Sequence, residues 1–239
     1  MLVKSNAIVL SKIKYGDSDI IVKCYTKHRG VGNYIVRGAL KSKKGSGKIA
    51  YFQPLTQLVI EENFKPKHSL QSFKNVRIDY LYKTLHSDVY KSSIVMFLSE
   101  VLSASLFEEE ENEPLYNYLE SALQWLDLQS DYSNFHLLFL INLTRLLGFY
   151  PEVKHVDFPF FNLESGQFEL KKTSNYSVSG EKLNVLKLFL GTNFDAITSI
   201  KLNGNQRQQI LTMILQYFEL HLDDFKKPKS LQIFNQVFS

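Results

Sequence analysis

The sequence has a single cysteine, Cys24, among 239 residues. One cysteine cannot form an internal disulfide or a cysteine-based zinc site, so the chain does not depend on an oxidising compartment. No run approaches the roughly 18 uninterrupted apolar residues of a membrane-spanning helix. The apolar stretch at the N-terminus is too short and too interrupted for a signal peptide. We therefore expect a cytoplasmic protein that does not insert into a membrane.

Recognisable catalytic motifs are also missing from the sequence. The segment Gly45-Ser46-Gly47-Lys48 comes nearest. A phosphate-binding loop, however, needs a glycine where Ser42 stands and a serine or threonine where Ile49 stands. The six histidines lack metal-ligand spacing, and His155 with Asp157 is typical of a surface pair. The sequence thus predicts no metal, no cofactor and no catalytic residue, and an enzyme is unsupported.

Positive charge is concentrated in the first third of the chain. Residues 1–80 contain 15 Lys and Arg against 5 Asp and Glu, a net charge of +10. Residues 81–239 contain 13 Lys and Arg against 19 Asp and Glu, a net charge of −6. The modest total of +4 therefore hides a basic region joined to an acidic one. A local field of this sign attracts polyanions, above all nucleic acid.

Short β-branched segments separated by turn residues fill this basic region. They predict strands at residues 7–13, 20–26, 31–37, 55–61 and 70–76. Five short strands in about eighty residues fit the oligonucleotide/oligosaccharide-binding (OB) fold, a small Greek-key barrel. From residue 81 the apolar period changes from 2 to 3.6, which predicts helices at 94–107, 114–128, 134–147, 179–190 and 206–222.

The two patterns together predict an α+β protein. We expect a five-stranded OB-fold barrel over residues 1–80 and a helical domain over residues 81–239. The helical domain is expected to contain a small hairpin-like segment at about residues 156–172, because residues 160–170 alternate around a turn. The boundary falls near Tyr80, where both the period and the sign of the charge change.

The chemistry of the basic region centres on residues 37–48, which we call the basic loop. It carries five cations and no acid, with three glycines among them. Flexible lysines can follow a phosphate backbone, and neighbouring aromatic rings can stack on the bases of a single strand. Phe52 is expected in the core rather than in this role. The predicted nucleic-acid-binding residues are Lys12, Lys14, Lys23, Arg29, Tyr34, Arg37, Lys41, Lys43, Lys44, Lys48 and Tyr51.

Motifs along the whole chain resemble the RecO family of bacterial recombination mediators. The N-terminal resemblance is carried by Ala7-Ile8-Val9-Leu10, Tyr15-Gly16-Asp17-Ser18-Asp19-Ile20, Thr26 with Gly30, Val36-Arg37-Gly38-Ala39, the basic loop and Gln53-Pro54. Leu147-Gly148-Phe149-Tyr150-Pro151 resembles the segment after the family's central helix. Lys229-Ser230, before Leu231 and Phe234, resembles its C-terminal Lys-Ser element.

The resemblance implies a non-enzymatic protein of DNA repair and homologous recombination, in the RecFOR pathway. Such a protein binds single- and double-stranded DNA, anneals complementary strands and helps load RecA onto DNA coated by single-strand-binding protein. The implied partners are DNA, RecR and the acidic C-terminal tail of single-strand-binding protein, with RecA as an indirect one. We expect the protein at the nucleoid. The residues expected to hold the acidic tail are Lys226, Lys227, Lys229, Leu231 and Phe234.

One departure from the family concerns zinc. Many members carry four cysteines after the Leu-Gly-x-x-Pro segment, and these hold a zinc ion. Phe160–Leu170 occupies that place here without any cysteine. We therefore expect no zinc, and an apolar hairpin packed in its place.

Two alternative functions remain open at this stage. An RNA-binding OB protein of translation or RNA processing fits the charge and the aromatic rings equally well, because contacts to the 2′-hydroxyl separate RNA from DNA. The second alternative is an enzyme with an unrecognised site in the helical domain. Such an enzyme would have a cleft lined by convergent groups with perturbed pKa values.

Overall fold

A computed structural model describes residues 2–41, 49–107 and 109–238. Lys43, Lys44 and Lys48 of the basic loop lie outside the described residues. The chain forms two compact units, residues 1–127 and residues 128–239. The domain boundary near Tyr80 stays a prediction, because the first unit holds the helices that directly follow the barrel as well as the barrel itself.

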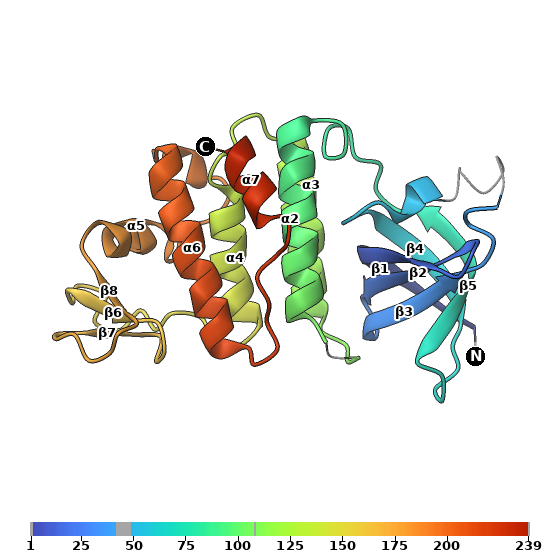
Figure 1. The fold of residues 1–239 in the computed structure, drawn as a ribbon, viewed down its shortest axis with the longest axis horizontal. Coiled ribbons are helices and arrows are strands. Elements are labelled where there is room, and N and C mark those ends of the chain that lie inside the picture. The colour runs from blue at the N-terminus through green and yellow to red at the C-terminus, as the bar shows by residue number, and fades with distance from the viewer. Residues whose placement is uncertain (1, 42–48, 108, 239) are drawn as a thin grey trace. The chain divides into compact units, whose positions relative to one another are not determined.

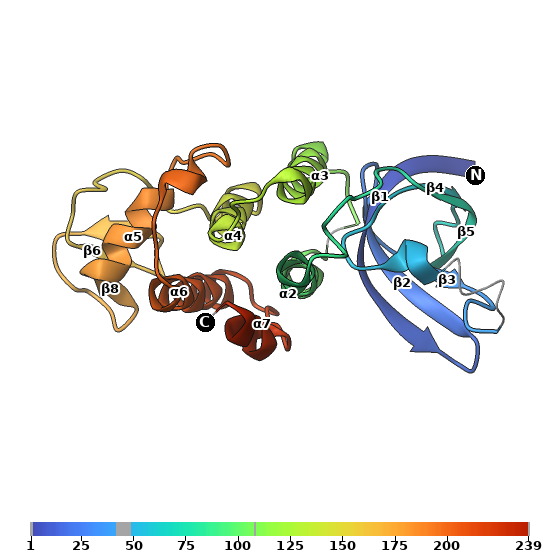
Figure 2. The same cartoon turned by 90° about the horizontal axis from the view of Figure 1, so that it is seen from above.

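The first unit begins with a closed OB-like barrel of five strands, as predicted. Its strands are β1 (Leu2–Tyr15), β2 (Asp19–Thr26), β3 (Gly30–Val36), β4 (Gln57–Asn63) and β5 (Leu70–Ile78). They follow one another around the barrel in the order β1-β2-β3-β5-β4 (Figures 1 and 2). All pairs are antiparallel except β3 with β5, which run parallel over only three residue pairs. A short 3₁₀ helix, η1 (Ala50–Phe52), precedes β4.

Strand β1 is longer than predicted because it pairs with two partners. Residues 2–8 pair with β4, and residues 7–15 pair with β2. A register shift between Val9 and Ser11 bends the strand between these two halves. Strand β4, by contrast, begins at Gln57 rather than at Leu55. Leu55 has a backbone φ of 59°, whereas residues in a β-strand have a negative φ, so Leu55 cannot belong to β4.

The barrel interior follows the two-residue period of its strands. Its buried residues include Ala7, Val9, Ile20, Val22, Cys24, Leu58 and Ile60. Three rings lie among them as a parallel stack: Phe73 lies 4.3 Å from Tyr34 and 5.7 Å from Phe52, between ring centroids. Burial raises the pKa of the Cys24 thiol, so this cysteine is an inert core residue, as expected.

Two helices complete the first unit, α2 (Val89–Ser105) and α3 (Glu113–Leu128). Helix α2 begins five residues before its predicted start, because the Asp88 side chain caps it by accepting the Lys91 N–H. Near the end of α3, the buried Asp127 carboxylate accepts N–H groups from the segment between the barrel and α2. These bonds anchor that segment to α3.

The second unit contains α4 (Phe135–Leu146), β6 (Phe160–Asn162), β7 (Gln167–Glu169), β8 (Ser177–Ser179), α5 (Glu181–Phe189), η2 (Ile197–Ser199), α6 (Gly204–His221) and α7 (Leu231–Val237). The predicted hairpin is confirmed as β6 and β7, and its Phe161 and Phe168 rings are buried and lie 4.9 Å apart. Strand β8 is an addition: Ser179 pairs with Phe160 instead of beginning a helix. Helix α7 was not predicted either.

Within residues 2–41, 49–107 and 109–238, no helix combines the length and the apolar character needed to cross a membrane.

Candidate nucleic-acid interface

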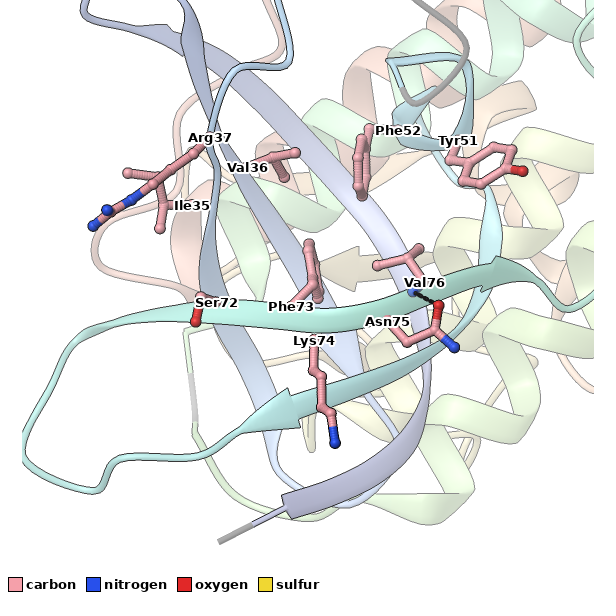
Figure 3. Close-up of a pocket in the computed structure, with 10 residues that line it drawn as sticks. All are labelled: Ile35, Val36, Arg37, Tyr51, Phe52, Ser72, Phe73, Lys74, Asn75 and Val76. Atoms are coloured by element: carbon pink, nitrogen blue, oxygen red, sulfur yellow. Dashed lines mark hydrogen bonds between the residues drawn. The ribbon is translucent and has the colours of Figure 1, made fainter. Parts of the chain in front are cut away.

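A groove opens in the barrel wall where β3 and β5 separate. The two strands pair from Asn33 with Leu70 to Ile35 with Ser72 and then diverge. Their separated ends and η1 enclose a cavity of about 340 Å³ (Figure 3). We call it the β3–β5 groove. Its lining residues are Ile35, Val36, Arg37, Tyr51, Phe52, Ser72, Phe73, Lys74, Asn75 and Val76.

Local backbone features on both strands explain why they diverge. In β5 the register against β4 shifts, so that Glu62 faces Phe73, Glu61 faces Asn75, and Lys74 has no partner residue. Such a bulge bends a strand and redirects its side chains. After β3, Gly38 adopts a φ of 65°, and its N–H donates to the Asp19 carboxylate at 2.8 Å. This bond holds the turn that carries the chain away from the barrel wall.

The groove has an apolar back and a cationic rim. Phe73 and Val76 form part of the back, together with Phe52, which is only 2 % exposed. Arg37 and Lys74 are exposed at the rim, on different sides of the groove (Figure 3). None of the lining residues is acidic. A surface of this kind can hold a phosphate at its edge and an apolar ring within it.

Asn75 at the rim and Asp19, which lies outside the groove lining, are both fixed in place. The Asn75 side chain accepts the Val76 N–H at 3.0 Å through Oδ1, which leaves its amide N–H groups as donors (Figure 3). On the β3 side, the Gly38 N–H and the Ser18 hydroxyl hold the pKa of Asp19 below its usual range. The Asp19 carboxylate therefore stays charged and offsets part of the positive field of Arg37 and Lys41.

The structure gathers some of the predicted residues around this groove. Arg37 and Tyr51 line it, and the Tyr51 side chain is 37 % exposed. Lys41 is exposed just beyond the Gly38 turn. Lys12 and Lys14 are exposed on β1, opposite Val22 and Ile20 of β2. Partial burial lowers the pKa of Lys12.

Tyr34 was predicted to stack on bases, and this prediction is wrong. Its side chain is fully buried inside the barrel. Its hydroxyl donates to the Glu62 carboxylate at 3.2 Å, and burial raises the pKa of the phenol. A ring without exposed surface cannot stack on a nucleobase.

Lys23 and Arg29 are also held by the protein itself. The Lys23 ammonium donates to the carbonyl oxygens of Ser103 and Leu106 at the end of α2, at 2.8 and 3.0 Å. Arg29 pairs with the buried Glu62 at 3.3 Å and lies over the Phe64 ring. Both cations are thus used to hold the fold, which argues against their predicted role as phosphate ligands.

Sequence reasoning missed the β5 side of the groove. Ser72, Lys74 and Asn75 belong to a segment that the sequence identified only as a strand. Alternation along the strand could have placed Ser72 and Lys74 on its outer face. The bulge that brings Asn75 to the rim leaves no signal in the sequence.

The C-terminal basic patch is only partly as predicted. Lys226, Lys227 and Lys229 are all exposed, and Lys227 also pairs with Glu219 at 2.8 Å. Phe234 is 2 % exposed and packs edge-on against the His136 ring, 4.9 Å away between centroids. The prediction that Phe234 offers an apolar surface to a partner is therefore wrong, because α7 buries this ring.

The described parts of the chain hold no group of three or more His, Cys, Asp and Glu side chains arranged to bind a metal ion. The absence of zinc stays a prediction.

The fold and its cationic groove define an OB-like barrel protein with a helical C-terminal region. Two family models match this chain: Recombination protein O N terminal over residues 1–82, and Recombination protein O C terminal over residues 86–232. The chain belongs to the RecO family of DNA repair and recombination proteins.

Curated relatives match the chain over its full length. The DNA repair protein RecO of Christiangramia forsetii is 45% identical over 238 residues, and that of Flavobacterium johnsoniae is 46% identical over 239 residues. The RecO protein of Phocaeicola vulgatus is 34% identical over 242 residues. In each case the match covers 100% of both chains. The family predicted from the sequence motifs is confirmed.

Proposed function

We propose that this protein is a recombination mediator that binds single- and double-stranded DNA and anneals complementary strands. It helps to load RecA onto DNA coated by single-strand-binding protein, with RecR as a further partner, in the cytoplasm at the nucleoid. Membership of the RecO family supports this role. The observation that carries it is the acid-free β3–β5 groove, whose rim holds Arg37 and Lys74.

The proposed mechanism is electrostatic. Two DNA strands repel each other through their phosphates, and cations on the barrel lower this repulsion so that complementary bases can meet. Annealing breaks no covalent bond and needs no catalytic group.

The proposed DNA surface combines the groove with the neighbouring exposed cations. It consists of Lys12, Lys14, Arg37, Lys41, Tyr51 and Lys74, and the basic loop residues Lys43, Lys44 and Lys48 are assigned to it from the sequence alone. For the tail of single-strand-binding protein we propose the exposed Lys226 and Lys229.

Two double variants with equal charge loss test the DNA surface. Arg37→Ala with Lys74→Ala removes the rim cations, whereas Lys65→Ala with Lys67→Ala removes exposed cations from the β4–β5 turn. The rim variant should anneal complementary oligonucleotides more slowly, both with and without single-strand-binding protein. Its log–log salt slope for single strands should flatten by about 1.4, at about 0.7 for each lost contact.

The outcome can also contradict the proposal. Equal losses in the two double variants would remove the groove from the DNA surface. A matched RNA oligomer that competes as well as DNA would favour the RNA-binding alternative.

A further inference from the structure

We propose that the β3–β5 groove takes one unpaired nucleobase of the bound strand and thereby distinguishes single-stranded from duplex DNA. This inference rests on the proposed DNA-binding function. It names an unpaired nucleobase as the ligand of one part of the proposed DNA surface, the β3–β5 groove. It assigns a role to the residues on the β5 side, Ser72, Lys74 and Asn75, which the sequence did not single out.

The size and lining of the groove fit a single flat ring system. A volume of about 340 Å³ is at the lower end of small-molecule pockets and is far too small for a base pair with its two backbones. The back of the groove is apolar, with Val36 from β3 and Phe73 and Val76 from β5. The faces of Phe73 are covered by Tyr34 and Phe52, so an inserted base would meet its edge and the valine side chains, with the exposed Tyr51 as the ring open to stacking.

The polar groups at the mouth fit the rest of a nucleotide. Arg37 follows β3 and Lys74 lies on β5, on the face opposite Phe73 (Figure 3), so phosphates of a strand that crosses the groove would meet a cation from each strand. The free amide N–H groups of Asn75 and the hydroxyl of Ser72 can bond to the edge of the base. A base in a duplex has this edge paired and both faces covered by its neighbours, so it cannot enter.

The groove is formed before any ligand arrives. Phe73 is held between Tyr34 and Phe52 in the parallel ring stack, and the Tyr34 hydroxyl is fixed by Glu62. The bulge in β5 sets the direction of Lys74 and Asn75. A site that is already ordered loses less conformational freedom on binding, which favours insertion of a base over contact with phosphates alone.

The test compares strands that differ only in their bases. Oligothymidylate and an abasic oligomer of equal length carry the same phosphates, so both measure the cationic surface and only the first can fill the groove. Wild-type protein should bind oligothymidylate about thirtyfold more tightly, the middle of the range for one stacked base. Ser72→Trp should block the groove, reduce this ratio towards one and leave the affinity for the abasic oligomer unchanged.

Controls separate the possible outcomes. Ser69→Trp, an exposed residue three positions before Ser72, should keep the wild-type ratio. Asn75→Trp, three residues further along β5, blocks the groove if Ser72→Trp does not fold. Equal binding of the two oligomers by wild type, or an unchanged ratio in both blocking variants, would overturn the inference and assign the cavity to another ligand, such as an apolar peptide side chain. Failure to bind either oligomer would instead overturn the proposed DNA-binding function.

Discussion

Lys23 offers a sharp test, because the sequence and the structure give it different roles. The sequence places it among the DNA-binding cations, whereas the structure shows its ammonium bonded to two carbonyl oxygens at the end of α2. These carbonyls have no partner within the helix, and a cation there also interacts favourably with the helix dipole. Lys23→Met keeps most of the apolar stem and removes both bonds. We therefore expect a loss of stability and little loss of DNA affinity.

The magnitude follows from the two bonds. A hydrogen bond to a charged group contributes about 1.5–3 kcal/mol, so two contribute about 3–6 kcal/mol before any cost is subtracted. Burial opposes this gain, because it disfavours the charged ammonium and lowers the pKa of Lys23. Methionine also retains contact with the Phe107 ring, which lies 5.3 Å from the ammonium. The free energy of unfolding should therefore fall by about 1–3 kcal/mol.

The assay measures urea unfolding and single-strand binding on the same preparations. Lys14→Met is the matched control, because Lys14 is exposed on the adjacent strand. Its free energy of unfolding should stay within about 0.5 kcal/mol of wild type, and its DNA affinity should fall. If Lys23→Met weakens DNA binding more than Lys14→Met does while stability is unchanged, the structural role assigned to Lys23 is wrong.

Three further predictions concern the basic loop, a buried histidine and zinc. Replacing Lys41, Lys43 and Lys44 together by Ala should flatten the log–log salt slope for single strands by about 0.7 per lost contact; unchanged affinity at low salt in a folded variant would contradict this. His136 is buried and its pKa is lowered to about 3, so the unfolded chain binds a proton between pH 6.5 and pH 3 that the folded chain does not. As the pH falls through this window, the free energy of unfolding of the wild type should therefore decrease by at most about 1.4 kcal/mol per pH unit, and by less in His136→Leu. Urea unfolding at pH 7 and at pH 5 measures this decrease, and an equal decrease in the two proteins would refute the assignment. Elemental analysis of protein purified without added metal should find no stoichiometric zinc, and one zinc per chain would contradict that expectation.

The sequence by itself determined the charge asymmetry, the family, and the order of the strands and α-helices other than β8 and α7. Strands β2 to β5 and the helices at residues 114–128, 134–147 and 206–222 were located within a few residues, because apolar periods of 2 and 3.6 are local properties of the chain. The hairpin at residues 160–170 was predicted for the same reason. The clustering of cations in residues 37–48 needs no structure to be recognised either.

The tertiary structure decided which of those side chains are accessible. Tyr34 and Arg29 look like ligands of nucleic acid in the sequence, yet both contact Glu62, which is 28 residues or more away along the chain. Phe234 is covered because it packs on His136, nearly a hundred residues earlier. Local periodicity carries no information about such distant partners.

The β3–β5 groove depends on the same kind of long-range information. It exists because a parallel pairing between β3 and β5 stops after three residue pairs, and because the β5 bulge gives Lys74 no partner. Both are consequences of closing the barrel, which fixes the register between strands far apart in sequence. The sequence supplied the cations and rings, and barrel closure determined which of them surround a cavity.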